Sequence, residues 1–104
     1  MDGNGMARLV EAAAFVKTNS TALRLLQELA ANRKPMSTRD LLAAVGISRY
    51  SHNVLLRLEA LGLVKRFEGE KCEGNVCFKV VYNAITSLGR QVLALLENGN
   101  CRET

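Results

Sequence analysis

Residues 35–64 read PMSTRDLLAAVGISRYSHNVLLRLEALGLV and decide the fold. Their apolar residues recur at helical spacing in two short segments, which a turn at Gly46 separates. Ser37 or Thr38 can cap the first helix with a hydroxyl group. The second helix is expected at residues 48–61, and Gly62 can end it in the left-handed conformation. We therefore predict two amphipathic helices joined by a tight turn, the outline of a module that reads DNA.

The second helix carries polar residues opposite its apolar stripe. These residues are Arg49, Tyr50, His52, Asn53 and Arg57. Arg49 suits a bidentate contact to guanine and Asn53 a pair with adenine, although an exposed polar residue on a helix is often only solvated. Tyr50 can contact a phosphate or a thymine methyl group, or cover the edge of the core. His52 is the only histidine in the chain, which gives little support to a metal or catalytic site.

Positive charge is concentrated in one part of the chain. Residues 33–66 hold seven lysines and arginines against two acids, a net charge of +5, whereas the whole chain carries +4. Such a local excess is expected when one face neutralises phosphates, although a solvated helix surface gives the same pattern. Contacts to phosphate groups are predicted for Lys34, Arg39, Lys65, Arg66 and Lys71.

The length of 104 residues and the apolar content of 48% fit one folded domain. We expect an N-terminal helix at 6–18, a core at 20–85 and a C-terminal helix at 86–98. No apolar run approaches the ~18 residues that cross a bilayer, so we expect no membrane contact and a cytoplasmic location. A phosphate-binding glycine loop, a zinc-protease motif and a nucleophile elbow are all missing from the sequence, so we expect neither an enzyme nor a cofactor.

Two extended segments after the helices predict a β-hairpin at 63–82. Gly74 and Asn75 form a two-residue turn with glycine in the first central position, as type II′ prefers. Counting outward from this turn pairs Cys72 with Cys77, Glu70 with Lys79, and Phe67 with Tyr82. Pairs of opposite charge and of aromatic rings each stabilise a ribbon by about 0.2–1 kcal/mol, so the pairing supports this register.

In this register Cys72 and Cys77 face each other as a non-hydrogen-bonded pair with Cα atoms ~4.5 Å apart. That separation is at the short end of the range for a disulfide, which we favour over two free thiols or a metal-binding or redox-sensing pair. A metal would need ligands that the local sequence lacks, so no metal site is predicted. Because disulfides inside cells are common in hyperthermophilic archaea, the pair points to such a source. Cys101 is left over, either free or bridging two subunits.

The helices at both ends of the chain are more apolar than one small core requires. Either this excess is ordinary core packing, or it covers a partner subunit. We expect a homodimer, whose two-fold symmetry would place two DNA half-sites ~34–36 Å apart.

Four motifs together resemble a known family. They are Lys34-Pro35-Met36-Ser37 with Leu41 downstream, Gly46-Ile47-Ser48, Leu55-x-x-Leu58-x-x-Leu61-Gly62-Leu63-Val64, and Tyr82 followed by Ile85-Thr86-x-x-Gly89-Arg90. Across residues 20–96 the chain resembles the prokaryotic winged helix-turn-helix regulators, in particular small archaeal ones related to the MarR and PadR groups. The resemblance implies a mostly helical α+β fold, a winged helix-turn-helix with a β-hairpin wing and additional N- and C-terminal helices.

In function, the resemblance implies a transcriptional regulator that binds double-stranded DNA. Helix 48–61 would enter the major groove, and the wing at 63–82 would lie on the backbone or in the minor groove. The resemblance leaves the operator sequence and any small-molecule effector unknown.

Two rival functions remain open on the sequence alone. A winged helix can serve as a protein-interaction subunit of a transcription or replication complex, because a fold does not fix a function. Such a subunit would expose apolar or acidic residues, and Leu56 is the residue that argues for it. An RNA-binding module is the third possibility, although no aromatic-rich sheet indicates it.

Overall fold

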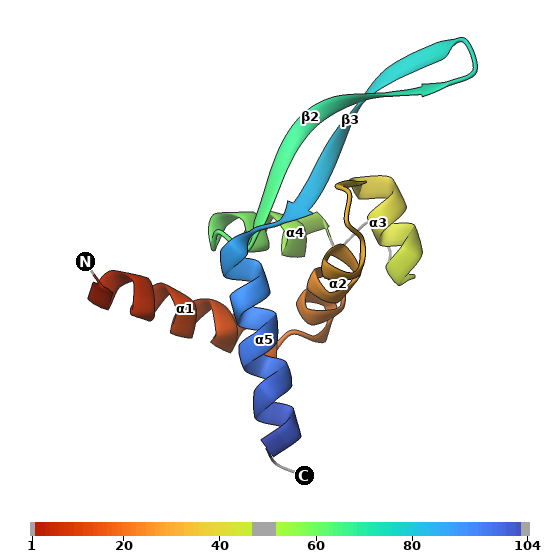
Figure 1. Ribbon diagram of the computed structural model, residues 1–104. Helices are drawn as coiled ribbons and strands as arrows, with labels where there is room; N and C mark the ends of the chain where they lie inside the picture. Colours follow the sequence, from red (N-terminus) through yellow and green to blue (C-terminus); the bar gives the residue numbers. More distant parts are fainter. Residues whose placement is uncertain (1, 47–51, 103–104) are drawn as a thin grey trace.

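Helices and a small antiparallel sheet make up the fold in a computed structural model that describes residues 2–46 and 52–102 (Figure 1). In these ranges the elements are α1 (Asp2–Lys17), α2 (Ser20–Ala31), β1 (Met36–Ser37), α3 (Thr38–Val45), α4 (His52–Ala60), β2 (Val64–Glu73), β3 (Val76–Ile85) and α5 (Ser87–Arg102). The mostly helical α+β class is the one predicted from the sequence.

Side-chain caps fix where three of the helices begin. Asn19 accepts a hydrogen bond from the amide of Ala22 at 3.0 Å, and Ser37 accepts one from Asp40 at 3.1 Å. Thr86 Oγ1 accepts from the amide of Gly89 at 3.0 Å. Each cap satisfies an amide of the first helical turn that has no partner within its helix. The predicted cap of α3 at Ser37 is therefore confirmed.

The end of α4 sets the direction of the hairpin. Gly62 has φ 80° and donates to the carbonyl of Glu59 at 2.9 Å, while Leu63 donates to Leu58 at 2.9 Å. This pair of hydrogen bonds is the Schellman pattern, in which glycine takes the left-handed position at no steric cost. It turns the chain so that Leu63 and Val64 are buried as β2 begins.

The three strands form an antiparallel sheet in the order β1-β3-β2. The predicted hairpin register is confirmed, including the pairs Cys72–Cys77, Glu70–Lys79 and Phe67–Tyr82. In the turn Gly74 has φ 61° and Asn75 does not have a positive φ, as type II′ requires. β3 runs to Ile85, three residues beyond the predicted end, because its last residues stay paired with Val64–Arg66 of β2. β1 pairs with the other edge of β3 through Met36–Asn83 and Ser37–Tyr82.

Both terminal helices extend beyond their predicted limits. α1 begins at Asp2 rather than residue 6, and α5 continues through Gly99, where the sequence predicted its end, to Arg102. Glycines near both ends led to these errors, since glycine has low helix propensity and is common after the last helical residue. Such local preferences are weak and did not decide these two helices.

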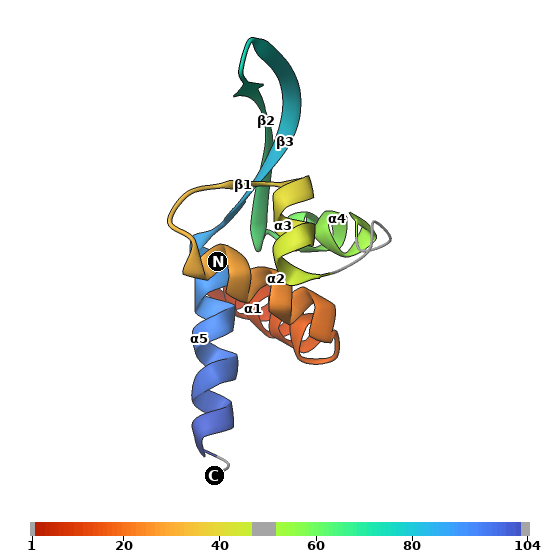
Figure 2. The same ribbon diagram turned by 90° about the vertical axis from the view of Figure 1, so that its right-hand side faces the viewer.

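The core is built around α2. Its buried leucines Leu25, Leu26 and Leu29 belong to one cluster with Leu41 of α3 and Leu55 of α4. Each leucine that is fully removed from water stabilises the fold by about 1.5–3 kcal/mol. Figures 1 and 2 show the hairpin and α5 projecting from this cluster in opposite directions. The projections explain a radius of gyration of 14.7 Å, compared with the ~13 Å expected for a compact domain of this length.

The two ends of the hairpin are fastened to α5. Thr86 donates its amide to the carbonyl of Leu63 at 3.1 Å and its hydroxyl to Gly62 at 2.6 Å. Gly89 is buried next to this junction, and a Cβ atom there would overlap the carbonyl oxygen of Leu63 and approach Ile85 to 2.7 Å. The glycine therefore allows α5 to approach β2 closely.

Candidate nucleic-acid interface

The predicted base-reading residues fall into two groups. Arg49 and Tyr50 lie outside the described residues, as does the rest of the segment 47–51. His52 and Asn53 form the first turn of α4 as the structure describes it, and both are exposed. Leu56, one turn further along, is 43% exposed. The outer side of α4 therefore combines two polar side chains with one large apolar side chain.

Arg57 contacts α1. Its guanidinium carbon lies 5.8 Å from the centre of the Phe15 ring. A guanidinium at this distance from an aromatic ring is attracted by the ring's electrons, with about 0.5–1 kcal/mol at exposed sites. Arg57 thus helps to hold α4 on α1. The sequence had grouped it with the polar residues of helix 48–61 and did not indicate this contact.

Asn83 is the centre of a buried polar cluster that positions the hairpin. Its side chain is fully buried; Nδ2 donates to the carbonyl of Met36 at 3.1 Å and to Thr38 Oγ1 at 3.0 Å. Its Oδ1 accepts from Arg66 Nε at 2.9 Å, and Arg66 Nη2 donates to Thr38 Oγ1 at 3.2 Å. Thr38 in turn donates to Val81 O at 3.3 Å, so its hydroxyl group uses its donor and both acceptor positions. The cluster joins β1, the start of α3 and both strands of the hairpin.

A second contact holds the outer part of the hairpin to α3. Lys71 Nζ lies 3.0 Å from Asp40 Oδ2. The hydrogen bond from Lys71 lowers the pKa of the Asp40 carboxyl group below its usual 3.8, and a hydrogen bond from Ser37 contributes to the shift. The same contact raises the pKa of Lys71 above its usual 10.5. Both groups are substantially exposed, so this pair adds little to the stability of the fold. Its effect is to keep the outer part of the hairpin close to α3.

A cleft of about 220 Å³ lies between the start of α3 and the hairpin. It is lined by Ser37, Arg39, Asp40, Lys71, Glu73, Phe78 and Val80. Arg39 is exposed at this cleft. Lys34 before β1 and Lys65 on β2 are also exposed, although neither lines the cleft. The ion pair found among the described residues joins Lys71 to Asp40. It involves none of Lys34, Arg39 and Lys65, so the charges of these three residues are available to a ligand. The predicted pair of Glu70 with Lys79 has the correct register but is not within ion-pair distance in this part of the chain.

The hairpin also exposes apolar side chains. Phe67 and Tyr82 stack with ring centres 5.8 Å apart, as the predicted pairing required. Phe67, Val76, Phe78 and Val81 are all exposed, Val76 to 62%. Residues 64–85 hold four bases and three acids, so the hairpin is less positive than the region before it.

Cys72 and Cys77 are joined by a disulfide across the hairpin, with Cα atoms 4.0 Å apart, as predicted. Glu70, which was expected only to pair with Lys79, has its Oε1 atom 3.8 Å from Cys72 Sγ. The alternation of side chains along a strand places residues two apart on the same face, and this rule could have identified the neighbour.

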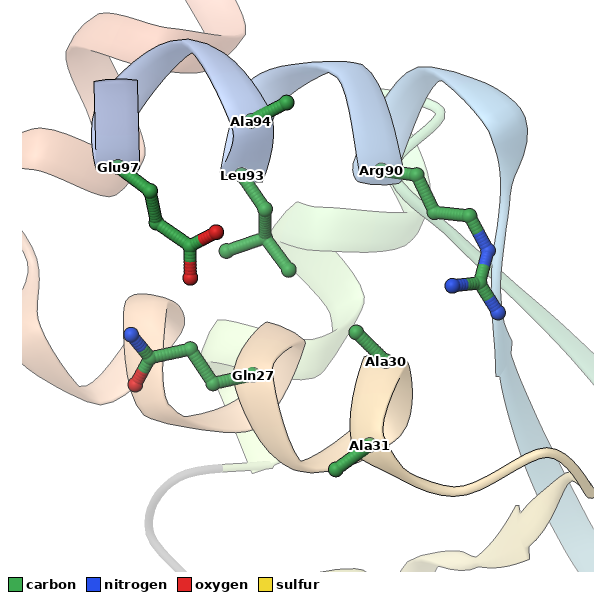
Figure 3. Close-up of a pocket in the computed structure, with 7 residues that line it drawn as sticks. All are labelled: Gln27, Ala30, Ala31, Arg90, Leu93, Ala94 and Glu97. Atoms are coloured by element: carbon green, nitrogen blue, oxygen red, sulfur yellow. The ribbon is translucent and has the colours of Figure 1, made fainter. Parts of the chain in front are cut away.

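A separate depression of about 390 Å³ lies between α2 and α5. Figure 3 shows Arg90 at one end, Glu97 and Gln27 at the other, and Leu93 between them. Ala30, Ala31 and Ala94 complete the lining. None of these residues was predicted to contact DNA, and none carries the nucleophile or imidazole on which many catalytic sites depend.

No known family model matches the chain, and no curated protein is significantly similar to it in sequence. None of the helices within residues 2–46 and 52–102 is both long and apolar enough to span a lipid bilayer.

Proposed function

We propose that the chain is a winged helix-turn-helix protein that binds double-stranded DNA with sequence specificity and regulates transcription. The observation that carries this proposal is a set of exposed bases, Lys34 before β1, Arg39 on α3 and Lys65 on β2, in a chain whose helix α4 also exposes the polar side chains His52 and Asn53. Exposed bases can anchor phosphates, and hydrogen-bonding side chains on an exposed helix can read bases.

The order α2, β1, α3, α4, β2 and β3 supports the winged-helix assignment. In such a module α4, together with residues 48–51 that precede it, enters the major groove, and the hairpin lies beside the backbone. Asn53 and Arg49 would then contact base edges, with His52 and Tyr50 at the border of the contact. Arg39 and Lys65 would bind phosphates, since phosphate contacts set the register of a protein on DNA without carrying sequence information.

Two residues that were predicted to bind phosphates, Arg66 and Lys71, contact other side chains of the protein. Arg66 is hydrogen-bonded to Asn83 and Thr38, so its first role is to hold the hairpin at a fixed angle to α3. Lys71 is paired with Asp40 and would have to exchange a carboxylate for a phosphate. Both residues therefore position the hairpin, and any contact that they make with DNA is additional to this role.

A second copy of this chain is the partner proposed for α1 and α5. Figure 1 shows the two helices extending beyond the rest of the molecule, and they pack against each other. Val10 on α1 is 60% exposed and Leu95 on α5 is 49% exposed. Pairing of these helices would remove apolar surface from water and bring two α4 helices together on one side of a two-fold axis.

The DNA-binding proposal is tested by selecting bound fragments from random duplex DNA and titrating variants on selected and random sequences. Arg49→Ala should cost ~1–3 kcal/mol on the selected site and much less on random DNA. Lys65→Ala should weaken both equally and reduce the salt dependence by about one phosphate. Lys17→Ala, which removes an exposed charge at the end of α1, is the matched control and should change neither. If Arg49→Ala weakens both DNAs equally, Arg49 is not a base-reading residue.

Exposed apolar residues favour one alternative, a protein-interaction subunit of a transcription or replication complex. Leu56 on α4 and Phe78 and Val76 on the hairpin are large exposed apolar side chains, which a contact with phosphates does not require. Under this alternative the selection from random DNA enriches no sequence.

A further inference from the structure

We propose that reduction of the Cys72–Cys77 disulfide creates a binding site for a thiophilic divalent cation, such as Zn²⁺, at the outer end of the hairpin. The ligands are the two cysteine thiolates and the Glu70 carboxylate. This inference goes beyond DNA binding and does not depend on it.

The three side chains already lie together. Glu70 and Cys72 are two residues apart on β2 and so share a face, and Cys77 is directly opposite Cys72 on β3. Their oxygen and sulfur donor atoms are all within 4.8 Å of one another. In a tetrahedral zinc site with Zn–S of ~2.3 Å and Zn–O of ~2.1 Å, neighbouring ligand atoms are ~3.5–3.8 Å apart. The 3.8 Å between Glu70 Oε1 and Cys72 Sγ meets this requirement.

The hairpin keeps the cysteines opposed without the disulfide. Ten residue pairs connect β2 and β3, and the Phe67–Tyr82 stack lies further along the same ribbon. After reduction only the two sulfur atoms must separate, which rotation about the Cα–Cβ bonds allows. Glu70, Cys72 and Cys77 are all exposed, so both a reductant and a cation can reach them.

The chemistry balances in two steps. A dithiol reductant transfers two electrons and two protons to the disulfide, which becomes two thiols while the reductant becomes a cyclic disulfide. Binding of the cation then releases the two thiol protons, because the thiolate is the ligand. Two thiolates and one carboxylate leave the site with a charge of −1, which the Lys79 ammonium group opposite Glu70 can offset. Three protein ligands leave a fourth coordination position for water.

The test compares the oxidised and reduced full chain in calorimetric titrations with Zn²⁺ alone, after removal of the dithiol without air. The reduced chain should bind one Zn²⁺ and release two protons, and the oxidised chain should bind none at this site. With Cd²⁺ as a second probe, the thiolate-to-metal absorption band should appear only after reduction. Equal binding by both redox forms would overturn the proposal.

Variants assign the ligands. Cys72→Ser and Cys77→Ser should each abolish the absorption band, whereas Cys101→Ser should retain it. Glu70→Gln should weaken Zn²⁺ binding at least ~10-fold, because even partners outside the ligand set change affinity by about 10–100-fold. Glu73→Gln removes the same charge from the opposite face of the hairpin and is the matched control. Loss of the band in Cys101→Ser, or equal affinities of the two glutamine variants, would contradict the assignment. Circular dichroism of each reduced variant verifies that its fold is retained.

Discussion

Replacement of Asn83 by alanine should destabilise the protein more than most single substitutions. The fully buried side chain makes three hydrogen bonds, to Met36 O, Thr38 Oγ1 and Arg66 Nε. Each such bond contributes about 1 kcal/mol net, and buried groups left without a partner add to the loss. We therefore expect Asn83→Ala to lower the free energy of unfolding by about 3–4 kcal/mol. A domain of this size has roughly 5–15 kcal/mol in total, so the variant should still fold.

Urea denaturation followed by circular dichroism measures this loss as a lower midpoint at an unchanged slope. Asn53→Ala, at an exposed position on α4, is the matched control and should change stability by less than ~0.5 kcal/mol. A double-mutant cycle with Arg66→Ala should give a coupling energy of about 1 kcal/mol or more, since the two side chains share a hydrogen bond. A loss below ~1 kcal/mol for Asn83→Ala would refute the claim that this cluster holds the hairpin in place.

Three further predictions concern other parts of the molecule. Gly89→Ala should lower the free energy of unfolding by about 1–3 kcal/mol, measured by thermal unfolding, because the added methyl group overlaps the carbonyl oxygen of Leu63, just before β2. An unchanged melting temperature would show that α5 does not approach β2 so closely. Asp40→Asn should free Lys71, speed amide exchange in the outer hairpin and strengthen DNA binding. In the native chain the same release should follow protonation of Asp40 in acid, at a lower pH than for an unpaired aspartate, because the hydrogen bond from Lys71 depresses the pKa of Asp40. Leu95→Glu should convert the proposed dimer to a monomer in light scattering without loss of helical content. Leu56→Glu, at a similarly exposed leucine, is the control and should leave the dimer intact. A native chain that is monomeric with and without DNA would exclude the dimer.

Local rules predicted the elements whose cause is local. The cap at Ser37, the glycine stop at Gly62 and the Gly74-Asn75 turn each depend on a few consecutive residues. Because the turn fixes the count along both strands, the hairpin register and the disulfide followed from it.

Contacts between distant residues could not be predicted in the same way. The hydrogen bonds of Asn83 join residues 17 to 47 positions apart and depend on the pairing of β1 with β3. The curvature of the hairpin brings Lys71 to Asp40, and no pattern in the sequence specifies that curvature. The sequence therefore identified Arg66 and Lys71 as basic residues of the hairpin but could not show that both contact other parts of the protein.

The central claim is that the chain binds duplex DNA through exposed bases such as Lys34, Arg39 and Lys65. The affinity of the native chain for DNA as a function of salt concentration tests this claim most directly. Neutralisation of about five to eight phosphates per dimer predicts that log K falls with log salt with a slope of roughly −4 to −7. A slope near zero, or no binding at low salt, would contradict DNA binding and favour the protein-interaction function.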